Sequence, residues 1–220
     1  MAASHTLIFI GGDSPHPNVR QHLPTNAYVI AADSGYAHAI AMGFTPNELV
    51  GDMDSITPVD LTDAHDSNVL ITQFPTDKDL TDTEIAIASA IARHSKHITV
   101  VSGGGDRFDH VLGMVHSLSS CALTVNTTLL MGTARVSYAT YTKEFRINTQ
   151  PGNIMSLIPL GGDAIVTTTG LQWELNNDTL QSFASRGVSN IASGESVTIS
   201  VTTGVLAVIE PFFLNRGDFQ

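Results

Sequence analysis

A chain of 220 residues, of which 42% are hydrophobic, can bury one large core or two smaller ones without disulfide bonds. Its 21 acidic side chains exceed its 10 basic ones, and the formal net charge of −11 disfavours nucleic acid and anionic membranes as partners. The single cysteine, Cys121, cannot form an internal disulfide, so we expect a reducing, cytoplasmic location. The first apolar stretch, Leu7 to Ile10, is too short for a signal peptide or a membrane span.

Strand-like and helix-like segments alternate in the first half of the chain. Short apolar runs predict buried parallel strands at residues 6–10, 27–32, 48–50, 69–74 and 97–102. Helices are expected over 36–41, from the capping box of Thr81 and Glu84 to about His94, and from Asp109 onward. Strands that alternate with helices predict a parallel sheet with helices on its faces.

The second half has a different pattern. From Ala122 onward, short stretches rich in Val, Thr, Ile and Leu are separated by turn signals, one of them at Gly161-Gly162. This pattern is typical of a β-sandwich or barrel. We therefore predict an α/β domain over residues 1–125 and an all-β sandwich over residues 126–220.

An acidic turn follows the expected strand at 48–50, with the sequence Gly51-Asp52-Met53-Asp54-Ser55. Two carboxylates one residue apart at the end of a buried strand suit Mg²⁺, which prefers oxygen ligands and is usually held by carboxylates together with substrate phosphates. The alternative is an Asx turn, in which the aspartates only accept hydrogen bonds from the backbone.

Further acidic residues flank the neighbouring elements. Asp33 follows the strand at 27–32, Asp79 and Asp82 stand at the start of the helix from Thr81, and Asp109 follows a glycine run. In an open α/β sheet the ligand site lies beyond the carboxyl ends of the strands, so we expect these carboxylates to converge there. Taken alone, the two at the helix start would be explained by the helix dipole.

A polyphosphate would need positive groups beside the acidic ones. Gly103-Gly104-Gly105 precedes the helix from Asp109 and offers backbone N–H groups at a helix N-terminus. Arg107 can bind phosphate oxygens with its guanidinium group, and Lys78 can act as a point charge. The simpler alternatives are a chain turn at the glycines and a solvated lysine.

Several motifs occur in the order Asp33-Ser34-Gly35, Gly51-Asp52-Met53-Asp54-Ser55, Lys78-Asp79-Leu80-Thr81-Asp82, Arg107-Phe108-Asp109-His110, Thr169-Gly170-Leu171-Gln172-Trp173-Glu174-Leu175 and Val188-Ser189-Asn190. In this order they resemble the motifs of the thiamine pyrophosphokinase (thiamine diphosphokinase) family. The resemblance implies an α/β domain, a β-sandwich, a homodimer with sites at the subunit interface, and Mg²⁺-dependent transfer of the pyrophosphoryl group of ATP to the hydroxyl of thiamine, which releases AMP.

Two positions depart from the family pattern. The family commonly has Asp-Gly-Gly where this chain has Asp33-Ser34-Gly35, a change that adds only a hydroxyl. It commonly has a glycine where this chain has Asp106, which places a carboxylate beside the expected phosphate loop.

The resemblance assigns the acidic positions to metal binding and proton transfer. Asp52, Asp54 and Asp82 correspond to the family's metal carboxylates, with Asp79 in support. The thiamine hydroxyl must lose a proton as it attacks, and the acceptor is one of these carboxylates or His110.

The basic positions and the first glycine loop are assigned to the nucleotide. Arg107 and Lys78 would stabilise charge on the phosphates, and Asp109 would orient Arg107 or the metal shell. Gly11-Gly12-Asp13 closes the first strand and would approach the nucleotide.

Thiamine carries a cationic thiazolium ring, which suits an acidic pocket with an aromatic face. Trp173, the only tryptophan, is the candidate for that face, or else a packing residue of the sandwich. Ser189 and Asn190 would hydrogen-bond the aminopyrimidine ring from the partner subunit, as the resemblance implies. Asp33 would also face thiamine or its hydroxyl.

Two other functions fit parts of the pattern. An Asp-x-Asp turn after a strand also serves metal-dependent glycosyltransferases, although these have no evident need for the motif from Arg107 to His110. A sensor that binds thiamine or nucleotide without turnover would leave the full set of metal carboxylates unexplained.

Overall fold

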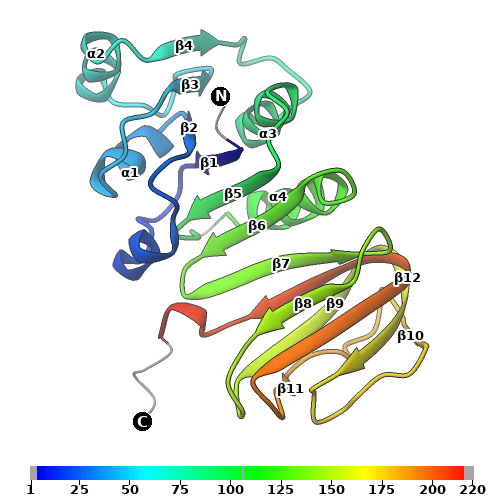
Figure 1. The fold of residues 1–220 in the computed structure, drawn as a ribbon. Helices are drawn as coiled ribbons and strands as arrows, with labels where there is room; N and C mark the ends of the chain where they lie inside the picture. Colours follow the sequence, from blue (N-terminus) through cyan, green and yellow to red (C-terminus); the bar gives the residue numbers. More distant parts are fainter. Residues whose placement is uncertain (1–3, 106, 216–220) are drawn as a thin grey trace. The chain divides into compact units, whose positions relative to one another are not determined.

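The computed structural model describes residues 4–105 and 107–215 (Figure 1). The chain divides into two compact units, one formed by residues up to Met114 with Thr128–Gly132, the other by Val115–Thr127 with the residues from Thr133 onward. None of the helices in the described residues is long and apolar enough to cross a lipid bilayer.

The first unit is built on a parallel sheet. Its strands are β1 His5–Phe9, β2 Tyr28–Ala32, β3 Glu48–Gly51, β4 Leu70–Gln73, β5 His97–Ser102 and β6 Asn126–Met131. They lie in the order β5-β1-β2-β3-β4, with β6 on the other side of β5. Three successive residues of β1, Leu7, Ile8 and Phe9, have no exposed surface, so both faces of the sheet are covered. The predicted parallel sheet is confirmed.

The helices in the part of the chain that the structure describes are α1 Gly35–Ala41, α2 Pro58–Asp66, α3 Asp82–Ala92 and α4 Phe108–Cys121, with short 3-10 helices at Pro17–His22 and Phe213–Asn215. The capping box at α3 is confirmed: the Glu84 N–H donates to Thr81 Oγ1 (3.2 Å), and the Thr81 N–H donates to Glu84 Oε2 (3.0 Å). Helix α2 was not predicted. The sequence does contain a start signal for this helix, namely Thr57 followed by Pro58. Thr57 is the N-cap and accepts a hydrogen bond from the Asp60 N–H, and Pro58 is the first helical residue.

The second unit is rich in antiparallel strands, which have the bounds β7 Ala134–Thr140, β8 Phe145–Asn148, β9 Ile154–Thr169, β10 Asp178–Leu180, β11 Asn190–Ile191 and β12 Ser196–Glu210. Strand β12 pairs with β7, β8 and β9, and β9 pairs with β10 and β11. An α/β region followed by a β-rich region is therefore the fold, as predicted.

Gly161-Gly162 was predicted to be a turn between strands, but it lies inside the 16-residue strand β9. Both glycines have positive φ (72° and 156°), and the register of the β9–β12 pairing shifts between Val201 and Val205. The glycines therefore bend one long strand and do not end it.

Candidate active site

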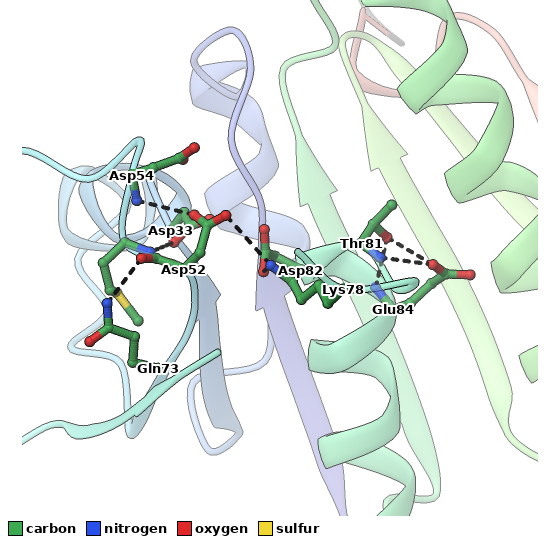
Figure 2. Close-up of polar contacts among 9 residues, drawn as sticks. Asp33, Asp52, Asp54, Gln73, Lys78, Thr81, Asp82 and Glu84 are labelled. Atoms are coloured by element: carbon green, nitrogen blue, oxygen red, sulfur yellow. Dashed lines mark hydrogen bonds and ion pairs between the residues drawn. The ribbon is translucent and has the colours of Figure 1, made fainter. Parts of the chain in front are cut away.

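Three carboxylates of the first unit meet beyond the carboxyl ends of its strands. Asp33 follows β2, Asp52 follows β3, and Asp82 is the first residue of α3 (Figure 2). One oxygen from each lies within 4.8 Å of the others. The expected convergence is confirmed for Asp33, Asp52 and Asp82.

The backbone holds Asp33 in an unusual position. The residue has a positive φ of 44°, and its Oδ1 accepts a hydrogen bond from the Met53 N–H (3.0 Å). Gly51 leaves it room, since a Cβ there would lie 2.1 Å from Asp33 Oδ1. Burial, partly offset by the Met53 hydrogen bond and reinforced by the nearby Asp82 and Asp52 carboxylates, raises the pKa of Asp33 to about 7.

Lys78 is the cation of this cluster. Its Nζ lies 3.1 Å from Asp82 Oδ1 and 3.5 Å from Asp52 Oδ2. The Asp54 N–H donates to Asp52 Oδ1 (3.1 Å), and this hydrogen bond, with the charge of Lys78, lowers the pKa of Asp52. The Asp54 side chain also interacts with the Asp52 carboxylate, which raises the pKa of Asp54 (Figure 2).

The donor set fits a magnesium ion. Carboxylate oxygens are its preferred ligands, and at a metal–oxygen distance of about 2.1 Å two ligands on opposite sides of an octahedron lie about 4.2 Å apart. The oxygens of Asp33, Asp52 and Asp82 fall within 4.8 Å of one another, so small side-chain shifts suffice. The shielded Asp82 Oδ1 has no hydrogen bond and only the ion pair with Lys78, which leaves it available to a stronger cation.

Two glycine loops lie beside each other next to the acidic cluster. The Asp13 N–H donates to Gly104 O (3.0 Å), and the Gly103 N–H donates to Asp13 O (3.1 Å). A Cβ at Gly12 would lie 2.3 Å from Gly104 O, and one at Gly103 would lie 2.2 Å from Asp13 O. Only glycine permits this close approach of the loops after β1 and β5.

Arg107 and Asp109 form a two-point ion pair at the end of the second glycine loop. Arg107 Nε donates to Asp109 Oδ1 (3.0 Å) and Nη2 donates to Oδ2 (2.8 Å). This pairing holds the pKa of Asp109 well below its usual range. The geometry agrees with the expectation that Asp109 orients Arg107, while Asp106 lies outside the described residues.

A pocket of about 530 Å³ joins these groups. The predicted site residues that line it are Gly11, Gly12, Asp33, Asp52, Asp54, Asp82, Arg107 and His110. Asp13, Asp79 and Asp109 are exposed and do not line it, so the expected convergence is wrong for Asp79 and Asp109. Lys78 reaches the site through its two ion pairs. The hydroxyls of Ser55, Thr83 and Ser102 also line the pocket and were not predicted, since their only signal in the sequence is their position beside the acidic and glycine motifs.

The departure at Ser34 is accommodated next to Gly11. A Cβ at Gly11 would lie 2.5 Å from Ser34 Oγ, so the extra hydroxyl occupies space that the glycine leaves. Ser34 lines the pocket, where its hydroxyl adds a hydrogen-bonding group.

A second pocket, of about 670 Å³, lies within the second unit. It brings Trp173 together with Ser189 and Asn190, which follow it by more than a dozen residues in the sequence, along with Leu157 and Arg186. The Trp173 side chain is largely exposed (56%), which argues against a role as core packing.

The raised pKa of Asp33 predicts a pH-dependent stability. When the pKa of a carboxyl group is higher in the folded protein than in the unfolded chain, the protein becomes less stable as pH rises from the lower value to the higher one. The reason is that the carboxyl group ionises first in the unfolded chain. Without metal, we expect the unfolding free energy of the native protein to fall relative to Asp33→Asn by on the order of 2–3 kcal/mol between pH 5 and pH 8. Urea unfolding in the presence of a chelator measures this, and parallel pH profiles would contradict it.

Comparison with known proteins relates both units to one family. The family model described as "Thiamin pyrophosphokinase, catalytic domain" matches residues 19–130. A second, described as "Thiamin pyrophosphokinase, vitamin B1 binding domain", matches residues 142–206.

Individual proteins agree with the two family models. "Thiamine pyrophosphokinase 1" of Oryza sativa subsp. japonica is 28% identical over 181 residues, which are 77% of this chain and 68% of the relative. "Thiamine pyrophosphokinase" of Bacillus subtilis (strain 168) is 25% identical over 195 residues, 88% of this chain and 91% of the relative.

Solved structures share the fold. The Bacillus subtilis thiamine pyrophosphokinase structure has a TM-score of 0.82 at 24% identity and covers 94% of this chain and 98% of its own. The yeast thiamin pyrophosphokinase structure has a TM-score of 0.75 at 18% identity, with 100% and 90% covered. Because the catalytic-domain model alone spans half of the sequence, the chain belongs to the thiamine pyrophosphokinase family.

Proposed function

We propose that this chain is a thiamine diphosphokinase that transfers the pyrophosphoryl group of ATP to the hydroxyl of thiamine and yields thiamine diphosphate and AMP. The observation that carries the proposal is the convergence of Asp33, Asp52 and Asp82 in a pocket that also contains the glycine loops and Arg107. Carboxylates for a metal beside N–H groups and a guanidinium for phosphates are the parts that phosphoryl-type transfer requires.

Magnesium is the proposed metal, and Asp52, Asp54 and Asp82 are the proposed metal carboxylates. The cluster supports Asp52 and Asp82 directly and adds Asp33. Asp54 lines the same pocket, where it can reach the water shell that Mg²⁺ usually keeps. When bound, the metal would neutralise charge on the polyphosphate.

The chain's own residues position the triphosphate and move the proton. The N–H groups of the loops after β1 and β5 and the guanidinium of Arg107 would hold the phosphates, with Asp109 fixing the guanidinium plane. Lys78 would turn from the aspartates to the phosphates once a metal ion shares those carboxylates. The thiamine hydroxyl would give its proton to a carboxylate of this pocket or to His110, which also lines it.

Thiamine is assigned to the pocket of Trp173, Ser189 and Asn190. The exposed indole face offers the thiazolium a cation–π contact, and the exposed Ser189 hydroxyl offers a hydrogen bond. On this assignment, residues 1–125 form the nucleotide- and metal-binding catalytic domain and residues 126–220 the thiamine-binding domain. The match of residues 142–206 to a vitamin B1 binding domain supports it.

We further propose that the enzyme is a homodimer in which the Trp173 pocket of one subunit completes the acidic pocket of the other. The family resemblance carries this assignment. A cytoplasmic location is proposed on the single thiol of Cys121, which is buried and unbridged.

Product analysis tests the proposed reaction. The purified protein is incubated with thiamine, ATP and Mg²⁺, with and without a chelator, and the products are separated by chromatography. We expect AMP and thiamine diphosphate in equal amounts, and neither after chelation. Release of ADP, or no product, would refute pyrophosphoryl transfer.

Replacing Trp173 with alanine tests the thiamine assignment. We expect the KM for thiamine to rise about five- to thirtyfold, because an aromatic face on a desolvated cation contributes on the order of 1–2 kcal/mol. The KM for ATP should stay within about twofold, since the nucleotide groups belong to the other pocket. Steady-state kinetics with each substrate varied in turn measure both, and an unchanged thiamine KM would remove Trp173 from the site.

A further inference from the structure

The segment that carries Trp173 is held by a short backbone ladder. The Ser193 N–H donates to Gly170 O (2.9 Å), and the Gln172 N–H donates to Ile191 O (2.8 Å). Between these bonds, Leu171 and Ala192 form an antiparallel bridge. The ladder fixes the residues before Trp173 but has no backbone bond for Trp173 itself.

The ladder stops because the opposite strand turns away. Ser189 has a positive φ of 60°, which is uncommon for a residue other than glycine, and its N–H donates to Ser156 Oγ (3.0 Å). The ladder therefore does not continue to Glu174, the next residue whose backbone would bond that strand.

Trp173 lies opposite Asn190 at a position that a regular ladder leaves without backbone hydrogen bonds, and the side chain of Asn190 bonds it instead. Its Oδ1 accepts from the Trp173 N–H (3.2 Å), and its Nδ2 donates to Trp173 O (2.8 Å). One amide group thus bonds both backbone polar groups of Trp173, as a paired strand residue would.

The same hydrogen bonds limit what else Asn190 can do. Its Oδ1 also accepts from the Ile191 N–H (2.8 Å), so both acceptor positions of that oxygen are used. The residue is 7% exposed, although it borders the pocket. Asn190 therefore cannot accept a hydrogen bond from an amino group of a ligand without giving up one that it makes to the chain.

We propose that Asn190 is a positioning residue, which fixes the backbone of Trp173 so that the exposed indole is already in place when thiamine binds, and that its carbonyl oxygen does not accept a hydrogen bond from thiamine. The proposal rests on the proposed function of the Trp173 pocket. A ring that is ordered before binding saves the entropy of ordering it on binding, and this saving appears as affinity for the ligand.

Trp173 is the only tryptophan of the chain, so its fluorescence reports its position without any substrate. In Asn190→Ala, we expect the time-resolved anisotropy of the indole to show a larger fast component than in the native protein. The KM for thiamine should rise about five- to tenfold, with kcat and the KM for ATP within about twofold.

Two further variants sharpen the test. Asn176→Ala removes another asparagine of the same segment, exposed and outside the pocket lining, and should leave the anisotropy and all kinetic constants unchanged. Asn190→Asp has the same shape and keeps both accepted hydrogen bonds, but it places an oxygen against Trp173 O. It should therefore change the indole anisotropy and the KM for thiamine in the same direction as Asn190→Ala does. It replaces Asn190→Ala in the test if the alanine variant does not fold.

The outcomes separate the positioning role from the alternatives. Native anisotropy with a raised thiamine KM in both Asn190 variants would mean direct contact with thiamine and would overturn the proposal. Altered anisotropy with an unchanged thiamine KM would overturn the link between the indole and thiamine. If the native protein forms no thiamine diphosphate, the proposed function fails, while the anisotropy comparison still tests whether Asn190 fixes Trp173.

Discussion

Asp52→Asn is expected to lower kcat by about 10²- to 10³-fold, because removal of one metal carboxylate should forfeit several kcal/mol of transition-state stabilisation at about 1.4 kcal/mol per factor of ten. Asp52 is at the centre of the site: it shares the cluster with Asp33 and Asp82, accepts from the Asp54 N–H and pairs with Lys78. An amide can still accept the Asp54 hydrogen bond but cannot supply the charge.

The fold should survive this change. Three carboxylates in one cluster repel one another when no metal is bound, so neutralising one of them removes a repulsion as well as an ion pair. Asp66→Asn, an exposed aspartate at the end of α2, is the matched control and should behave as the native protein does.

Single-turnover kinetics at saturating ATP, together with the Mg²⁺ concentration for half-maximal rate, measure the effect. We expect Asp52→Asn to need more Mg²⁺ as well as to react more slowly. A native rate and a native Mg²⁺ requirement would refute the metal assignment of this residue.

Mixing Asp52→Asn with Trp173→Ala is expected to give more activity than either variant has alone. In a symmetric dimer whose sites combine the acidic pocket of one subunit with the Trp173 pocket of the other, a mixed dimer of Asp52→Asn and Trp173→Ala carries both changes in one site and neither in the other. Random exchange makes half of the dimers mixed, so about a quarter of the native sites are restored.

The assay is performed at a thiamine concentration well below the KM of Trp173→Ala, so that this variant works at only a small fraction of the native rate. The two proteins are unfolded together and refolded, since slow subunit exchange would otherwise hide the effect. Asp52→Asn mixed with native protein is the control, in which activity should follow the fraction of native subunits. If the mixture of variants shows no more than the sum of its parents, both pockets belong to one subunit or do not cooperate.

The amino-acid sequence by itself determined the local helices and strands and the order of the acidic and glycine motifs along the chain. The capping box of Thr81 and Glu84 acts within one turn of helix, and the apolar runs that form β1 to β5 need only their own composition to be buried. The acidic turn at Asp52 and Asp54 and the glycine run before Arg107 are contiguous motifs, so their place at the ends of strands followed from the alternating pattern.

The tertiary structure alone decided which of these groups meet. Asp33 joins Asp52 and Asp82 because β2 and β3 are neighbours in the sheet and α3 begins beside their ends, whereas Asp79, three residues before Asp82, is exposed outside the pocket. The hydrogen bonds of Asn190 to Trp173 depend on where Ser189 turns the chain, a conformation that no local pattern predicts for serine. Sequence patterns specify periodicity and short-range hydrogen bonds, while contacts between distant segments depend on strand order and on single backbone conformations that many sequences can adopt.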